Sequence, residues 1–182
     1  MVRIVEVVPY NPDWPQQFSQ ESARLQEIIG PNVVAMHHIG STAIPGLSAK
    51  PTIDILIEVK SFEALDVCDQ DIIEIGYQSK GENGVEGRRY FQKLDGERHL
   101  YHLHAFQAGH PEVERHLNFR DYLRAHKDEA RAYQDLKVHL SGVFRYAAPE
   151  YTSAKTGFIN AVNQKAAAWR RGCDGPQHDP RG

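Results

Sequence analysis

Apolar and polar residues alternate most clearly over residues 52–59. In this stretch Ile53, Ile55 and Ile57 fall on one face of an extended chain. The residues on the other face are Thr52, Asp54, Leu56 and Glu58. Such alternation predicts a strand that buries its isoleucines and presents Asp54 on the opposite face.

A second alternating stretch follows a predicted hairpin. Asp95-Gly96 indicates the turn, with strands expected over 88–94 and 98–107. In the returning strand Leu100, His102, His104 and Phe106 share one face, while Tyr101, Leu103 and Ala105 share the other. If this strand lies beside residues 52–59, its two histidines face the same cleft as Asp54.

Other segments show helical spacing, separated by glycine and proline. Between 77 and 87 the chain is polar and glycine-rich, which predicts a loop. The N-terminal residues 3–8 predict a short strand or extended arm, and residues 33–36 a further strand. Helices are expected over 14–29, 61–75, about 112–126, 128–140 and 149–171.

Several local motifs together resemble one protein family. These are His38-Ile39-Gly40-Ser41-Thr42, Pro45-Gly46-Leu47, Ala49-Lys50-Pro51, Ile53-Asp54-Ile55, Leu117 to His126, and Tyr151 with Ala154, Lys155, Phe158 and Ile159. The pattern is similar to the GrpB family of the nucleotidyltransferase-fold superfamily. This resemblance implies an α/β fold, a small mixed sheet with helices on one side and a helical C-terminal part.

Length and composition narrow the class of protein. The 182 residues suffice for one domain, expected over 1–171, with a disordered tail over 172–182. A net charge of −3 gives no reason to expect nucleic-acid binding. Cys68 and Cys173 lie far apart, which argues against a disulfide framework, and no segment is apolar enough for a membrane span or a signal peptide. A cytoplasmic protein is the expectation.

The resemblance implies a metal site, which this sequence alters. Members of the superfamily carry two acidic residues that are separated by one residue on a strand, and a third on a neighbouring strand. Here the pair is Thr52 and Asp54, and the third position falls at His102 and His104. One carboxylate with two imidazoles suits a transition metal such as manganese, iron, nickel or zinc better than magnesium. The alternative is that both imidazoles hydrogen-bond to neighbours within the sheet.

Candidate ligand-binding groups surround this position. Gly40, Ser41 and Thr42 form a turn whose N–H groups suit phosphate oxygens, with Lys50 as a nearby point charge. The alternative is that the turn serves only to shape the chain. Further candidates for anion contact are Arg88, Arg120 and Arg124.

These observations predict a protein that binds a nucleotide or another phosphorylated small molecule. As an enzyme it would transfer a nucleotidyl or phosphoryl group, with Asp54 as metal ligand and His104 as metal ligand or general base. The alternative is a catalytically degenerate ligand-binding or accessory module. Because members of the family also occur fused to dephospho-coenzyme A kinase, that module would be linked to coenzyme A metabolism. An RNA-binding or protein-binding adaptor finds no support, since basic residues interleaved with aromatic residues are missing from the sequence.

Overall fold

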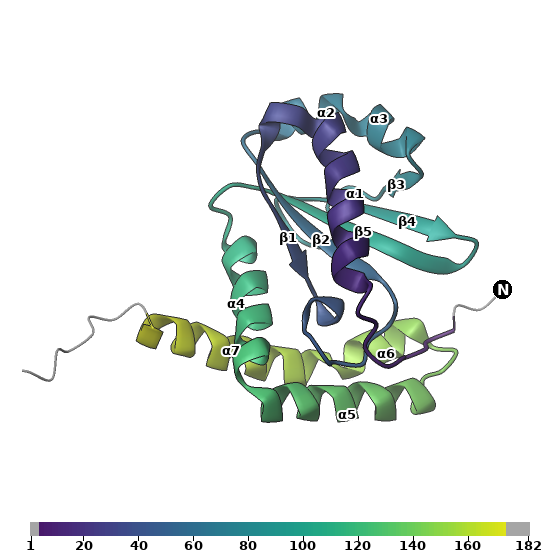
Figure 1. The fold of residues 1–182 in the computed structure, drawn as a ribbon, viewed down its shortest axis with the longest axis vertical. Helices are drawn as coiled ribbons and strands as arrows, with labels where there is room; N and C mark the ends of the chain where they lie inside the picture. Colours follow the sequence, from purple (N-terminus) through teal and green to yellow (C-terminus); the bar gives the residue numbers. More distant parts are fainter. Residues whose placement is uncertain (1–3, 174–182) are drawn as a thin grey trace, which may run out of the picture.

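The computed structural model describes residues 4–173, in which a five-stranded sheet carries helices on both faces (Figure 1). The strands lie in the order β1-β2-β5-β4-β3. Strands β2 and β5 run parallel and the other neighbours antiparallel, so the sheet is mixed. The strands are β1 (Val33–Ile39), β2 (Ile53–Val59), β3 (Tyr77–Ser79), β4 (Arg88–Asp95) and β5 (Arg98–Gln107). The predicted α/β class with a small mixed sheet is confirmed.

Seven α-helices and two short 3-10 helices complete the described residues. The first helix starts after Asn11, whose side chain accepts a hydrogen bond from the N–H of Asp13, and it ends at Gly30, where φ is 61°. The helices are α1 (Trp14–Ile29), η1 (Gly30–Asn32), η2 (Ser41–Ala43), α2 (Phe62–Val67), α3 (Asp69–Glu74), α4 (Pro111–Ala125), α5 (Lys127–Val143), α6 (Ala148–Ala154) and α7 (Thr156–Cys173).

The isoleucine face of β2 carries the main core. Ile53, Ile55 and Ile57 pack with Trp14 and Leu25 of α1, and all five are 2% exposed or less. Helices α2 and α3 contribute Leu65 and Ile72 to the same cluster. Each such side chain contributes roughly 1.5–3 kcal/mol by leaving water. This core fixes which face of β2 is turned inward, and therefore where Asp54 points.

Helix α4 packs against the opposite face of the sheet. Its Val113 joins Ile39, Leu56 and Phe106 in a second apolar cluster. Helices α5 and α7 pack on α4 through a third cluster that includes Tyr133. The C-terminal part is therefore helical as predicted, but helices cover both faces of the sheet, whereas the family resemblance implied helices on one side.

Three local predictions need correction. The single helix expected over 61–75 is broken at Cys68, whose N–H bonds to the carbonyl of Leu65 and so tightens the turn. The helix expected over 149–171 is broken at Lys155. The predicted loop after Gly76 begins with strand β3, where backbone pairing with β4 orders a segment whose side chains show no alternation.

The N-terminal arm forms one isolated bridge, between Val8 and Ala49, rather than a strand. Of the predicted tail over 172–182, Gly172 and Cys173 end α7 and the rest lies outside the described residues. Within residues 4–173 no helix has the length and apolar character that crossing a membrane requires.

Candidate functional site

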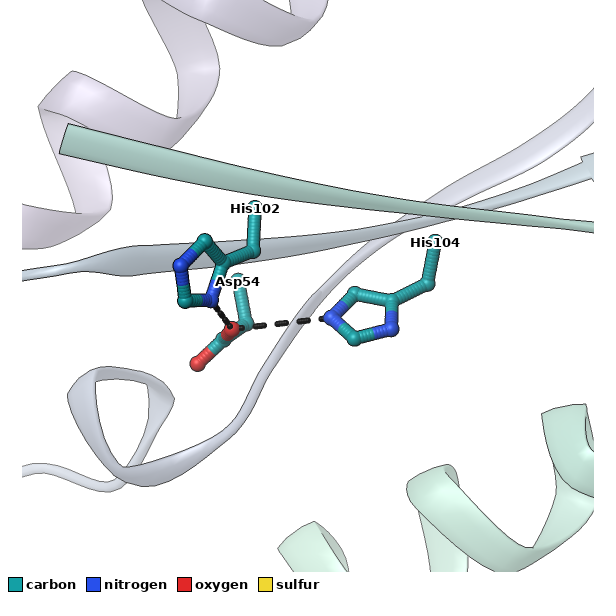
Figure 2. A group of neighbouring side chains, drawn as sticks. All are labelled: Asp54, His102 and His104. Atoms are coloured by element: carbon teal, nitrogen blue, oxygen red, sulfur yellow. Dashed lines mark hydrogen bonds and ion pairs between the residues drawn. The ribbon is translucent and has the colours of Figure 1, made fainter. Parts of the chain in front are cut away.

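The parallel pairing of β2 with β5 brings the predicted acidic and imidazole side chains together. In register, Asp54 lies opposite His102, and Leu56 lies opposite His104. Figure 2 shows both imidazoles turned towards the carboxylate. The Nδ1 atom of His102 lies 3.1 Å and the Nε2 atom of His104 lies 3.6 Å from Oδ1 of Asp54. The predicted adjacency of the two strands is therefore confirmed.

A chain of hydrogen bonds fixes His102. Its Nδ1 donates to Asp54, and its Nε2 lies 2.8 Å from Nδ1 of His99. Burial raises the pKa of the Asp54 carboxyl, but the hydrogen bond from His102 and the close approach of the His104 imidazole outweigh this effect and hold that pKa well below its usual range. Asp54 is therefore a carboxylate at neutral pH, and it accepts a hydrogen bond from His102 on the next strand.

His104 has a different second partner. Its Nδ1 lies 3.3 Å from NH1 of Arg88, while its Nε2 is buried without a hydrogen bond within 3.5 Å among the described residues. Burial lowers the pKa of His104, so the ring is neutral at neutral pH. Arg88 and His99 therefore contact the ring nitrogens of the two histidines that face away from Asp54.

One transition-metal ion is the cofactor that the sequence predicts here. Donor atoms of Asp54, His102 and His104 lie within 4.8 Å of one another, a spacing that suits a shared ion. The contact between Arg88 and His104 opposes metal binding. A guanidinium can only donate a hydrogen bond, so Nδ1 of His104 must accept it. The proton of the neutral ring then lies on Nε2, the atom that would have to face the ion. As arranged, the three residues do not fit a three-ligand metal site.

A cavity of about 450 Å³ opens at this cluster, between the sheet and the C-terminal helices. Its wall carries four cationic side chains, and among its described lining residues Asp54 is the carboxylate. The lining residues are Gly40, Ser41, Thr42, Lys50, Thr52, Asp54, His102, His104, Arg115, His116, Phe119, Tyr133, Lys137, Tyr151, Thr152, Lys155 and Ile159. The cavity therefore presents an excess of positive charge.

Two tyrosine–lysine pairs form the wall away from the sheet. Lys137 lies 4.7 Å from the ring centre of Tyr133, and Lys155 lies 4.2 Å from that of Tyr151. Lys50 approaches the Tyr151 ring to 5.1 Å. The predicted set contained Lys50 alone of these five residues. The signal for the others is the repeated spacing of four, which places Tyr133 and Lys137 on one side of α5, and Lys155 directly after α6, one turn beyond Tyr151.

Lys137 is the most deeply buried of these cations. Its side chain is 2% exposed and donates a hydrogen bond to the carbonyl of Ser48, in the segment before β2. Burial, together with the charge of Lys155, lowers the pKa of Lys137 to about 7. The amine therefore ties α5 to the central segment and is close to balance between its two protonation states at neutral pH.

The Gly40–Thr42 turn borders the cavity, but much of its polar capacity is used. The Thr42 hydroxyl lies 3.0 Å from Nε2 of His38 and donates to the carbonyl of Thr52. Ser41 also has a partner, because its side chain forms a hydrogen bond with Tyr133. This bond lowers the pKa of Tyr133, but burial outweighs it and raises that pKa to about 12. Phosphate binding by this turn stays a prediction.

Three arginines predicted for anion contact lie outside the cavity wall. Arg120 donates to the carbonyl of His38 and to Asp121, so it ties α4 to β1. Arg124 donates twice to the carbonyl of Ala43. Arg88 is buried behind His104 and faces carbonyls of the 82–83 segment. Their spacing in the sequence did not reveal that backbone carbonyls occupy these guanidinium groups.

A larger cavity, of about 610 Å³, is lined by Arg124, Lys127 and Arg131 over an apolar floor that includes Leu47 and Leu123. These cations lie on α4 and α5, where exposed side chains are commonly solvated, and no cluster of His, Cys, Asp or Glu able to hold a metal borders the cavity among residues 4–173. The cavity at Asp54 is the better candidate because perturbed ionisable groups converge there.

The family model for the GrpB protein matches residues 4–165. This chain belongs to the GrpB family. The UPF0157 protein YqkA of Bacillus subtilis is 45% identical over 170 residues, which cover 93% of this chain and 49% of that protein. The chain thus spans about half the length of this relative. The crystal structure of the conserved protein GrpB from Enterococcus faecalis has a TM-score of 0.85 at 36% identity and covers 88% of this chain and 96% of that one.

Two other similarities are weaker. A dephospho-CoA kinase of Mycolicibacterium paratuberculosis is 38% identical over 76 residues, 40% of this chain and 19% of the kinase. The structure of Cid1 in complex with its short product ApU has a TM-score of 0.41 at 11% identity, covering 67% of this chain and 39% of that chain. The Cid1 similarity is too distant to support an argument about function.

Proposed function

We propose that this member of the GrpB family binds a phosphorylated small molecule or nucleotide in the cavity at Asp54. The observation that carries the proposal is the group of lysines around the rings of Tyr133 and Tyr151, at the wall opposite the sheet. Ammonium groups suit phosphate oxygens as point charges, and aromatic faces suit a base or another flat apolar group. The volume of about 450 Å³ falls in the usual range for small-molecule sites.

Binding should depend on the lysines of the cavity and not on those outside it. Lys155→Met should weaken binding of ATP, measured by calorimetry with a chelator present, by roughly ten- to hundredfold, because a charge-assisted hydrogen bond to phosphate is lost. Lys127→Met removes a cation from the other cavity and should leave the affinity unchanged. Equal loss in both variants, or no binding by the wild-type protein, would contradict the proposal.

Nucleotidyl or phosphoryl transfer is the second candidate function. The feature that favours it is the convergence of Asp54, His102 and His104 at the sheet end of the cavity. Two features oppose it. A single carboxylate cannot hold two magnesium ions in the way that such transfer requires, and a His104 ring protonated on Nε2 cannot accept a proton there.

Magnesium-dependent transfer from nucleoside triphosphates should accordingly be weak or absent. The measurement is release or transfer of label when purified protein is incubated with labelled triphosphates and magnesium. Robust transfer that Asp54→Ala abolishes, and that changes at both His102 and His104 leave intact, would show that another carboxylate completes the usual site.

An accessory role near coenzyme A metabolism is the form of the binding proposal that the partial kinase similarity supports. The cavity would then hold a nucleotide without altering it. Dephospho-coenzyme A therefore belongs in the same calorimetric panel as ATP and inorganic phosphate, and tighter binding of it than of ATP would favour the accessory role.

A further inference from the structure

Arg88 is fixed beside the Asp54 cluster by contacts on three sides. It is the first residue of β4 and is 7% exposed. Its Nε donates to the carbonyl of Glu82 at 3.1 Å and its NH2 to that of Asn83 at 2.8 Å. The guanidinium lies 4.8 Å from the ring centre of Tyr90. Together these contacts aim NH1 at Nδ1 of His104, 3.3 Å away.

The chemistry of the two groups decides where the proton of His104 lies. A guanidinium has five N–H donors and no acceptor, so Nδ1 of the ring must supply the lone pair. A neutral imidazole carries one proton, which is therefore on Nε2. That atom is buried, has no hydrogen bond within 3.5 Å among the described residues, and faces Oδ1 of Asp54 at 3.6 Å. The Nε2–H bond thus points towards the place where an ion shared with His102 would lie (Figure 2).

We propose that Arg88 is a positioning residue that holds His104 in its Nε2–H form and thereby keeps divalent metal ions out of the Asp54 cluster. For an ion to bind all three side chains, the proton must move to Nδ1, where it would oppose the N–H of Arg88. The guanidinium also places a fixed positive charge beside the ion. Giving up a charge-assisted hydrogen bond should weaken metal affinity by roughly ten- to hundredfold.

The remaining two side chains do not share this obstacle. His102 can turn its Nδ1 lone pair to an ion if its Nε2 donates to His99, an arrangement common around bound metals. The exclusion therefore rests on a single contact, between Arg88 and His104. It is independent of the proposed phosphate binding, since it concerns the occupancy of the cluster by metal and not by ligand.

The chain offers a matched control in a second arginine–histidine pair. NH2 of Arg115 lies 3.1 Å from Nε2 of His116 on α4, and both residues line the cavity. Arg115→Met removes a guanidinium from an arginine–histidine pair and leaves the contact between Arg88 and His104 in place. In Arg88→Met the carbonyls of Glu82 and Asn83 lose their hydrogen-bond donor. Both residues are exposed, so water takes the place of the guanidinium there.

Nitrogen NMR of protein labelled with 15N-histidine tests the proton position directly. The wild-type spectrum should show His104, assigned by its loss in His104→Gln, protonated on Nε2. Arg88→Met should move the population towards Nδ1–H, whereas Arg115→Met should leave the His104 signals unchanged. A purely structural role for Arg88 would lower the melting temperature and leave the ring in its wild-type form. Protonation on Nδ1 in the wild type would overturn the proposal.

Metal titration gives the second measurement. Calorimetry of metal-stripped protein with zinc or manganese chloride should show a roughly ten- to hundredfold gain in affinity for Arg88→Met. Adding His104→Gln to that variant should remove the gain. Equal affinity in the wild type and Arg88→Met, or tight wild-type binding lost in His104→Gln, would overturn the proposal. If circular dichroism shows Arg88→Met unfolded, the wild-type spectrum and the comparison of wild type with His104→Gln still decide the question.

Discussion

Gly40→Ala should lower the free energy of unfolding by about 3 kcal/mol or more, enough to leave much of the protein unfolded at 37 °C. Gly40 has φ 72° and ψ −170°, a region that residues other than glycine rarely enter. Holding another residue there costs roughly 1–3 kcal/mol in backbone strain. In addition, a Cβ at this position would lie well under 3.0 Å from Oδ2 of Asp54 and 3.1 Å from its Cγ. Urea denaturation followed by circular dichroism measures the loss.

Gly46→Ala separates the two causes. Gly46 has φ 80°, but a Cβ there would meet nothing within 4 Å. Its substitution should therefore show the backbone strain alone, about 1–2 kcal/mol. Equal losses at Gly40 and Gly46 would mean that Asp54 moves away without cost, and that the close approach of the turn to the carboxylate does not constrain the site.

Lys137→Met should stabilise the protein at pH 7 and remove part of its dependence on pH. In the folded state the pKa of Lys137 is about 7, against 10.5 for the ordinary side chain, so the unfolded chain binds more protons between these values. Wild-type stability should therefore rise with pH from 7 towards 10.5. The difference between the two pKa values corresponds to roughly 5 kcal/mol of stability, at about 1.4 kcal/mol per pKa unit. The net gain in Lys137→Met is smaller by about 1–3 kcal/mol, because the carbonyl of Ser48 loses its hydrogen bond.

Urea denaturation of both proteins at pH 7, 8 and 9 measures this effect. The advantage of Lys137→Met should shrink as pH rises from 7 towards 10.5, because the unfolded amine gives up its proton on folding at a decreasing cost in free energy. Lys127→Met, at an exposed residue of the same helix, should follow the wild-type curve. Parallel curves for the wild type and Lys137→Met would show that the buried amine titrates as it does in water.

The strands of the site were predictable because side-chain alternation records burial. Ile53 and Ile55 had to face a core, and this alone placed Asp54 on the other side of the sheet. The alternation of His102 and His104 with Leu103 placed both imidazoles in the same way. Strand β3 left no such signal, because its backbone pairing with β4 orders it while two of its three side chains are exposed.

The polar side chains of the cavity were predictable only in part. Sequence shows which residues can carry charge, but not which carbonyl groups lie within their reach. Arg120 and Arg124 are used by the carbonyls of His38 and Ala43, which are about eighty positions away in the chain. Lys137 was not among the predicted site residues, because lysines on helices are usually solvated and its burial arises only when α5 packs near Ser48.

The parallel alignment of β2 with β5 has a consequence for the order of folding. The β4–β5 hairpin closes locally, with Asp95 paired to Arg98, whereas Asp54 and His102 are 48 positions apart in sequence. Loop-closure entropy makes a distant contact slower to form than a local one. The histidines should therefore be held in a finished hairpin before the carboxylate reaches them. A nascent chain or a partly unfolded molecule can thus contain the β4–β5 hairpin with both histidines while the cavity at Asp54 does not yet exist.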